Sequence, residues 1–396
     1  MSPHLDAAWH RQLLDELCAI PRGTATEGEA RAARWVADRL AEEGAPARLE
    51  EEPSNGGYWW PLGLAAGAGL VAGLAALRGR RGLATAIGAL AAAAAVDDLP
   101  PQDRRLRRLL PKRSAWNVIA EVGPEDAEHT VVLAAHHDTA HSGWIFSPAI
   151  PDTIDRAAPW VFKTADTSPP LMLPVVGAPA VVAAGAATGR RRLLRAGMAL
   201  CAGVAASMAE IGSRPAVPGA NDNGTGVVAL FALARALAER PTERLRVIFV
   251  STSEEATCEG IHHFAVRHFQ RLPVERTFFM FLDTVGSPYL CVLRGEGMLR
   301  MREYPAPALA LLDGLAEELG IELFPNLRLR NATDGVYPLA AGYPCAAVCS
   351  CTRLKQPANY HWPTDVPDNV DFGTLADAIR LAEAAVRRLD QSWLDS

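Results

Sequence analysis

Residues that can bind a metal ion stand directly after an apolar run in this sequence. The run Val131–Ala135 is followed by His136, His137 and Asp138, and His141 comes three residues later. Histidine nitrogen and carboxylate oxygen are ordinary ligands of zinc. At this point the cluster is either a surface accident or half of a metal site, because a site needs further ligands from elsewhere in the chain.

Four further segments place histidine or carboxylate near the end of an apolar run or in a neighbouring loop. They are GANDNGTG with Asp222, STSEE with Glu254 and Glu255, FLDTVG with Asp283, and NYHWPTD with His361. A single carboxylate at a strand end is more often a helix cap or a solvated charge. Ligands of open α/β sheets bind beyond the carboxyl ends of the strands, so convergence of the whole set on one edge predicts a site.

This set of residues suits metal-assisted hydrolysis. Two metal ions about 3.5–4 Å apart can hold a water-derived nucleophile and polarise a carbonyl, with one carboxylate bridging them. A neighbouring carboxylate that binds no metal can accept the proton of the water. The adjacent residues Glu254 and Glu255 can supply both roles, one to the metal and one to the water.

Strands and helices alternate along most of the chain. We expect two helices within residues 7–44 and further helices at 223–240 and 373–389. We expect strands at 47–52, 117–122, 130–136, 245–252, 278–285 and 345–350, several of them near-continuous apolar runs typical of strands buried on both faces. The pattern predicts an α/β fold with three layers, in which helices cover both sides of a mostly parallel mixed sheet.

Two uncharged regions interrupt this alternation, and each predicts a helical hairpin with a basic tip. The first, within 57–112, contains Tyr58–Leu77 and Gly82–Val96; the second, within 169–212, contains Pro169–Gly189 and Ala196–Gly212. One segment of each pair reaches the length of about 20 residues that spans a hydrocarbon core. The first also begins with an aromatic belt. We therefore expect transmembrane hairpins inserted into a catalytic domain formed by 1–56, 113–168 and 213–396.

Buried or peripheral helices are the alternative interpretation of these hairpins. Alanine is only weakly apolar, the second member of each pair is short, and Glu210 interrupts the last segment. The spacings Gly63/Gly67 and Gly69/Gly73 would let helices approach closely. They would also allow a homo-oligomer, besides the lipid bilayer that we expect as a partner.

Net charge and cysteine content indicate which partners and which cellular compartment to expect for this protein. The net charge of −6 without a polybasic tail predicts no nucleic-acid partner. Seven scattered cysteines without a CxxC pair favour a reducing compartment, and the N-terminus lacks a signal-peptide pattern. The basic segments 104–113 and 190–195 have opposite implications for membrane topology. Because no signal-peptide pattern is present, we expect a cytoplasmic catalytic domain.

Six segments together resemble the M28 metallopeptidases, the co-catalytic zinc aminopeptidase family. They are HHDT, GANDNGTG, STSEE, FLDTVG, TDGVYPLAAGYPC and YHWPTDVPDNVD, and they occur in the family's order. The resemblance covers most of the chain except the two hairpins. It implies a zinc aminopeptidase-like fold, two Zn²⁺ ions or other divalent metals, and a peptide or small amide as substrate.

The resemblance also implies a role for each matching residue. The implied metal ligands are His136, Asp222 as the bridge, Glu255, Asp283 and His361. Asp138 would orient an imidazole, Glu254 would be the general base, and Tyr360 would help to stabilise the oxyanion. His137 and His141 would not bind the metals, and Asp334 matches a further family aspartate whose role is open.

The expected activity is amide hydrolysis, with an aminopeptidase as the main hypothesis. The alternatives are a glutaminyl-cyclase-like acyltransferase with a single zinc, and a non-catalytic membrane receptor or scaffold of peptidase fold. The second hairpin separates His136 from Asp222, which are normally close in the family, and therefore leaves from the rim of the site. Trp144, Phe146 and Trp160 in segment 141–162 either line the pocket or merely anchor the insertion.

Overall fold

A seven-stranded mixed sheet lies at the centre of the catalytic domain in the computed structural model, which describes residues 3–102, 104–105, 107–253 and 257–394. Its strand order is β1-β2-β4-β3-β5-β10-β6. The strands are β1 (Ala47–Ser54), β2 (Arg113–Val122), β3 (His129–His136), β4 (Leu245–Thr252), β5 (Thr277–Asp283), β6 (Tyr289–Val292) and β10 (Cys345–Cys351).

The middle of this sheet is parallel and its edges are antiparallel. Strands β4, β3, β5 and β10 run in the same direction. Strands β1 and β2 pair antiparallel at one edge and β6 does so at the other. The predicted α/β fold with a mixed sheet is confirmed, although β6 was not foreseen because a strand of four residues leaves little pattern in the sequence.

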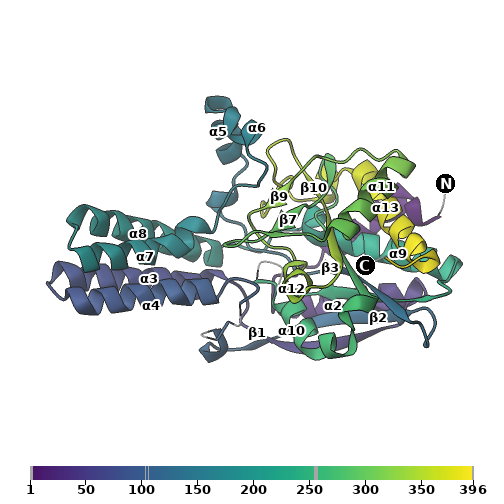
Figure 1. The fold of residues 1–396 in the computed structure, drawn as a ribbon, viewed down its shortest axis with the longest axis horizontal. Helices are drawn as coiled ribbons and strands as arrows, with labels where there is room; N and C mark the ends of the chain where they lie inside the picture. Colours follow the sequence, from purple (N-terminus) through teal and green to yellow (C-terminus); the bar gives the residue numbers. More distant parts are fainter. Residues whose placement is uncertain (1–2, 103, 106, 254–256, 395–396) are drawn as a thin grey trace.

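Helices cover both faces of the sheet and produce the three predicted layers (Figure 1). One core cluster joins Val131 and Leu133 of β3 to α1 (Ala7–Cys18), α2 (Glu27–Glu42), α9 (Thr225–Glu239), α11 (Ala306–Leu319) and α13 (Phe372–Gln391). The other joins Val132 and Ala134 to α10 (Glu259–His268) and α12 (Val336–Ala341). Successive residues of β3 thus bury opposite faces, as the pleat of a strand requires.

Several short elements complete the catalytic domain. A three-stranded sheet contains β8 (Arg302–Glu303), β7 (Gly295–Glu296) and β9 (Arg328–Leu329). Short 3₁₀ turns are η1 (Pro3–Leu5), η2 (Arg107–Leu109), η3 (Trp144–Phe146), η6 (Phe269–Arg271), η7 (Val274–Arg276) and η8 (Pro367–Asn369). A π-type turn, η4 (Ala220–Gly224), precedes α9.

The two hydrophobic regions form one four-helix bundle that extends away from the sheet (Figure 1). The first hairpin consists of α3 (Trp59–Leu77) and α4 (Arg81–Asp97), and the second of α7 (Leu173–Thr188) and α8 (Arg191–Ser213). Each hairpin packs against the other through α3 with α8 and α4 with α7. By length and composition α3 and α8 could each cross a membrane, whereas α7 is shorter.

The helix boundaries of the second hairpin differ from the prediction. The uncharged run Pro169–Gly189 yields a helix of 16 residues that begins at Leu173. Pro174 then lies in the first turn, where its missing N–H needs no partner within the helix. The partner α8 is longer than predicted, with 23 residues, since its first turn includes the arginines of the tip.

The aromatic residues at the start of α3 pack against the protein itself. The ring of Trp59 lies 4.2 Å from that of His141, between centroids, and the indole N–H of Trp60 donates to the carbonyl of Asn55 at 2.9 Å. Tyr58 is buried. The predicted aromatic belt at this position is therefore used to anchor α3 to the catalytic domain.

A connector between β3 and the second hairpin projects beside the base of the bundle (Figure 1). It contains η3 and the helices α5 (Ala149–Ala157) and α6 (Trp160–Thr164). Trp144 and Trp160 on this connector are more than half exposed, at 54% and 62%. They do not line the site, in contrast to one of the two possibilities left open by the sequence.

Candidate metal centre

Two of the predicted ligands are the last residues of neighbouring parallel strands. Ala134 of β3 pairs with Phe281 of β5, so His136 and Asp283, each two residues further on, end side by side at the carboxyl edge. Asp222 reaches the same place from the turn before α9. One ligand atom from each of these three residues lies within 4.8 Å of the others.

The carboxylate of Asp222 lies between two imidazoles. Its Oδ1 is 3.3 Å from Nε2 of His136, and its Oδ2 is 3.4 Å from Nε2 of His361. All three residues are buried. The arrangement presents one carboxylate oxygen to each histidine, which is the geometry that a bridge between two metal ions requires.

These distances fit zinc. Two ligands bound to a tetrahedral zinc at about 2.0–2.1 Å lie about 3.3–3.4 Å apart. Both carboxylate oxygens of Asp222 are buried and accept no hydrogen bond from the described residues. A buried, anionic acceptor is costly unless a cation compensates it, so the donor set and its spacing fit metal ions between Asp222 and the imidazoles.

Asp138 supports His136 from behind. Its Oδ1 lies 3.5 Å from Nδ1 of His136, and its Oδ2 accepts a short hydrogen bond from the hydroxyl of Thr24. Burial acts to raise the pKa of Asp138, but the contacts with His136 and Thr24 outweigh it and lower the pKa below its ordinary value. The carboxylate can therefore orient the imidazole so that Nε2 faces Asp222.

Two residues that the sequence reasoning did not single out hold the Asp222 turn in place. The carboxylate of Asp365 accepts hydrogen bonds from the backbone N–H groups of Asn221 and Asp222, at 2.8 and 3.0 Å. Burial, followed by the charge of Asp222, raises the pKa of Asp365 to about 7. Its position in the motif YHWPTD is the feature of the sequence that could have identified Asp365 as a site residue.

Arg22 is the second of these residues, and it is buried at 1% exposure. Its guanidinium donates to the carbonyls of His137, Pro218 and Gly219, at 2.7, 2.5 and 2.5 Å. It thus ties the loop after β3 to the turn that carries Asp222, although the second hairpin separates them in the chain. A single arginine in an N-terminal loop gave no signal in the sequence.

His361 and Tyr360 approach the site from the loop after β10. Their rings stack with centroids 3.9 Å apart, and Nδ2 of Asn331 donates to the phenol oxygen of Tyr360 at 2.9 Å. Phe146 of the connector packs its ring edge-on against His361, with centroids 4.6 Å apart. The backbone of His361 has φ +50°, a conformation that non-glycine residues adopt rarely and mostly at functional sites.

The remaining histidines near β3 have structural partners. Nε2 of His137 lies 3.1 Å from Glu29 and its Nδ1 lies 3.0 Å from the hydroxyl of Ser251. Nδ1 of His141 lies 2.6 Å from the carbonyl of Arg214. Both side chains therefore have partners within the protein.

Three predicted site residues remain, and the structure describes one of them. Asp334 is buried, and its Oδ2 accepts a short hydrogen bond from the hydroxyl of Thr252 at the end of β4. Glu254 and Glu255, the predicted base and ligand, lie outside the described residues.

Two cavities flank the metal centre. The strand-side cavity has Asp283, Asn331, Lys355 and Tyr360 among its lining residues. The bundle-side cavity is lined by Tyr360 and His361 at one end and by residues of the four-helix bundle at the other.

Solved structures with this fold include zinc enzymes. A Zn-dependent exopeptidase from Parabacteroides distasonis aligns with a TM-score of 0.57 and 16% identity over 97% of this chain and 98% of its own. A glutaminyl cyclase from Tannerella forsythia aligns with 0.59 and 16% over the whole of both chains. The zinc aminopeptidase BSAP from Bacillus subtilis aligns with 0.56 and 14% over 97% and 95%. At these identities the likeness establishes the fold.

The fold is shared with zinc-dependent peptidases, and the donor set described above fits zinc. The sequence model of Peptidase family M28 matches residues 205–386, a range that contains every predicted site residue except His136 and Asp138. Residues 205–386, somewhat less than half of the chain, are thus similar to that family. A comparison with curated proteins found no match.

Proposed function

We propose that this chain hydrolyses amide bonds at a centre of two zinc ions, with aminopeptidase action as the main form of that activity. The observation that carries the proposal is the carboxylate of Asp222, which offers one oxygen towards His136 and the other towards His361. In the proposal Asp283 completes the set around His136, and Glu255 completes the set around His361. Zinc, when bound, polarises the substrate carbonyl and lowers the pKa of water.

The side chains of the protein supply the remaining functions. Asp138 orients His136, while Asp365 and Arg22 fix the backbone that carries Asp222. Glu254 takes the proton of the attacking water and passes it to the leaving amine. The phenol of Tyr360, oriented by Asn331, donates towards the negative charge that develops on the carbonyl oxygen.

Replacing the base tests this assignment. We expect Glu254→Gln to retain two equivalents of zinc, because glutamine is nearly isosteric and Glu254 is not a proposed ligand. Turnover should fall by at least about 100-fold, the lower range for a general base. Metal analysis and steady-state kinetics measure the two effects, and unchanged turnover would refute the role of Glu254.

The form of the substrate is tested by a panel of free-amine peptides and N-blocked amides. Hydrolysis of free-amine peptides supports an aminopeptidase. Activity confined to N-blocked amides would replace that form by an N-acyl amide hydrolase and leave the metal centre in place.

A glutaminyl-cyclase-like acyltransferase is the second candidate, favoured by the structural likeness to glutaminyl cyclases. One zinc per chain and loss of ammonia from an N-terminal glutamine would support it. Two zinc ions and release of an amino acid or acid support hydrolysis. A non-catalytic receptor or scaffold would show neither reaction.

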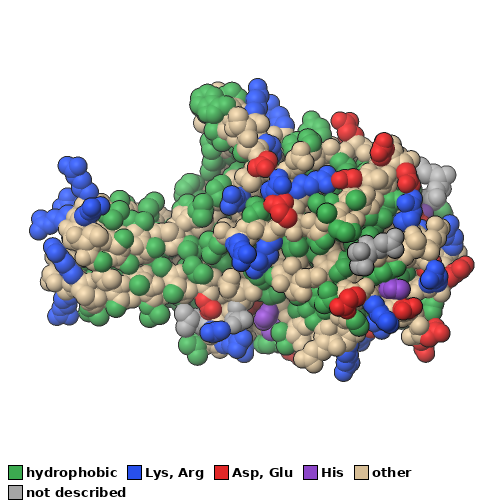
Figure 2. All heavy atoms as spheres, in the orientation of Figure 1, with side chains coloured by type: hydrophobic (Ala, Val, Ile, Leu, Met, Phe, Trp, Pro, Cys, Tyr) green, Lys and Arg blue, Asp and Glu red, His purple; other side chains and the backbone are tan. Residues whose placement is uncertain are grey.

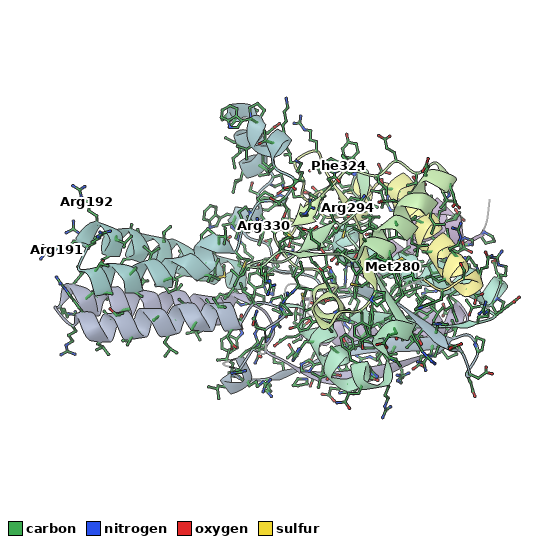
Figure 3. All side chains as sticks on the ribbon, viewed as in Figure 1. Arg191, Arg192, Met280, Arg294, Phe324 and Arg330 are labelled. Carbon is green, nitrogen blue, oxygen red and sulfur yellow. The ribbon has the colours of Figure 1, made fainter. Side chains whose placement is uncertain are left out.

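We further propose that the four-helix bundle inserts into a lipid bilayer. Helix α3, with 19 residues, is about 28 Å long at 1.5 Å per residue, close to the thickness of the hydrocarbon core. Apolar side chains on its outer surface are exposed, among them Leu64 and Val71. Arg191 and Arg192 project from the far end of the bundle, where basic side chains gather (Figures 2 and 3).

In this proposal the catalytic domain faces the cytoplasm. Cys291 and Cys351 are in contact and both thiols are free, which suits a reducing compartment. A cysteine placed at the exposed bundle tip by Arg80→Cys should then react with a membrane-impermeant maleimide in intact cells. Labelling only after lysis would show that the bundle tip, and not the catalytic domain, faces the cytoplasm.

A further inference from the structure

The bundle-side cavity connects the metal centre to the hydrophobic bundle. Tyr360 and His361 line the end of the cavity that belongs to the metal site. Leu62 of α3, Val175 of α7 and Met208 of α8 line the other end. A ligand in this cavity would therefore touch a predicted metal ligand and three bundle helices at once.

The charged groups of this cavity are already paired. The guanidinium of Arg107 binds Asp98 through two hydrogen bonds, at 2.7 and 3.0 Å, and lies 3.1 Å from Glu259. Asp98 is the carboxylate among the described residues that line the cavity. It is therefore committed to Arg107 and is not available to hold the free amine of a peptide.

An alkyl chain suits this lining better than a peptide segment does. The N–H and C=O groups of a peptide would lose their water and would find few partners among Leu62, Val175 and Met208. An alkyl chain has no polar group to satisfy. Each methylene that it buries strengthens binding by about fourfold, from the general value for apolar burial.

An exposed apolar residue lines the cavity at the base of the bundle. Leu171, just before α7, is 44% exposed and lines both the bundle-side and the strand-side cavity. If the bundle lies in a bilayer, this residue is placed where an acyl chain would pass from the hydrocarbon core to the metal centre.

We propose that the bundle-side cavity binds the long acyl chain of an N-acyl amino acid. The proposal rests on amide hydrolysis as the function of the site. The amide carbonyl lies at the metal centre, and the amino-acid part lies in the strand-side cavity. There the ammonium of Lys355, which also donates to the carbonyl of Ala165, has further N–H donors that can attract the carboxylate. Water adds to the carbonyl carbon and the C–N bond breaks. The products are a fatty carboxylate and an amino acid, whose amine takes the proton from the attacking water.

A series of acyl chains on one amino acid tests the proposal, with the full-length, zinc-loaded protein in nanodiscs. We expect kcat/KM to rise at least tenfold from the N-acetyl to the N-dodecanoyl compound. Equal values along the series, or faster cleavage of an apolar free-amine peptide, would overturn the acyl-chain assignment and leave amide hydrolysis standing. No hydrolysis of any amide in the series or of any peptide would overturn the proposed function itself.

Matched tryptophan variants of α3 and α8 test where the acyl chain of the substrate binds. Leu62→Trp and Met208→Trp place a large ring in the cavity, whereas Leu74→Trp changes a residue of α3 that is 46% exposed. We expect the first two to lower the ratio of kcat/KM for the dodecanoyl compound to that for the acetyl compound at least tenfold. The Leu74 variant should match the parent on both, which controls for partition of the substrate into lipid.

Photo-crosslinking provides a readout that does not depend on turnover or on a folded tryptophan variant. The probe is the unmodified protein with an N-acyl amino acid that carries a diazirine at the end of a twelve-carbon chain. Peptide mapping should find the adduct on α3, α7 or α8 at residues that line the cavity. Adducts only on the outer bundle surface or on the strand-side cavity would overturn the assignment.

Discussion

The core of the catalytic domain and the interior of the four-helix bundle are filled by different kinds of side chain. Large residues such as Phe231, Phe249 and Phe278 are completely buried around the sheet. Inside the bundle the buried positions are mainly small. They include Ala66, Gly69, Ala72, Gly73, Ala84, Gly88, Ala91, Ala178, Gly185, Ala186 and Gly197.

The outer surface of the catalytic domain is rich in charged side chains, whereas that of the bundle is mainly apolar. Charged side chains are spread over the visible face of the catalytic domain, whereas the shaft of the bundle shows mainly apolar and small residues (Figure 2). Leu64, Val71 and Leu90 on the bundle are more than half exposed. Water drives large apolar side chains inside, whereas lipid accepts them outside and helices then associate through small residues.

The glycines show how closely the bundle helices approach. A Cβ on Gly185 would lie 2.5 Å from the backbone nitrogen of Leu194, and one on Gly197 would lie 2.7 Å from that of Val182. Among the four glycines noted in α3, a Cβ on Gly69 would lie 2.6 Å from Sγ of Cys201, and one on Gly73 would lie 2.4 Å from Cγ of Met198. A Cβ on Gly67 would meet no atom within 4 Å. Most of the close helix packing that these glycines allow therefore occurs between helices of the same chain.

The largest effect is expected where the catalytic domain alone is changed. Asp222→Ala removes the carboxylate between His136 and His361, so both imidazoles lose their shared partner. We expect loss of bound zinc and a fall in kcat of at least about 1,000-fold, in line with the loss of metal-based carbonyl polarisation. Zinc analysis and kinetics measure this. The protein should remain in the membrane fraction. Its loss from that fraction would contradict the view that the metal centre and the bundle act independently.

The outer surface of the bundle is tested by Leu90→Asp at a position that is 65% exposed. In a bilayer the carboxylate should cost about 3 kcal/mol, whereas an exposed site in water should tolerate it within about 0.5 kcal/mol. Membrane fractionation and thermal unfolding in nanodiscs measure the change. Unaltered membrane recovery and stability would show that this surface faces water.

The interior of the bundle is tested by a matched pair of glycines in α7. Gly185→Leu forces a side chain against the backbone of Leu194, and we expect a loss of about 3 kcal/mol of stability. Gly177→Leu is the control, because a Cβ there has no neighbour within 4 Å. Equal unfolding temperatures for the two variants would contradict the close packing of α7 on α8.

The smallest effect concerns a buried carboxyl of the catalytic domain. Burial raises the pKa of Glu296 to about 7, although Thr333 and Tyr304 hydrogen-bond to its carboxylate. The folded state therefore keeps a proton that the unfolded state releases near pH 4.5. Stability should fall by roughly 2 kcal/mol as pH rises from 5 to 7. Glu296→Gln should flatten this dependence in thermal unfolding, and an unchanged slope would assign it to other groups.

The strand ends were predictable because the signal there is local. His136 and Asp283 directly follow apolar runs, and parallel strands place such residues at one edge. Arg22 and Asp365 could not be found in the same way, since their hydrogen bonds reach segments distant in the chain. The start of α7 was misjudged because apolar composition alone does not show that Pro174 marks the first turn of the helix.

The sequence by itself determined the chemical types of the proposed metal ligands, the strands that carry several of them, and the two uncharged hairpins. Those properties depend on side-chain chemistry and on short-range periodicity. The tertiary structure alone decided that both hairpins form one bundle, that Asp222 lies between two imidazoles, and that a cavity links them to the bundle. These features depend on distances between segments far apart in the chain, which packing fixes and which no local pattern encodes.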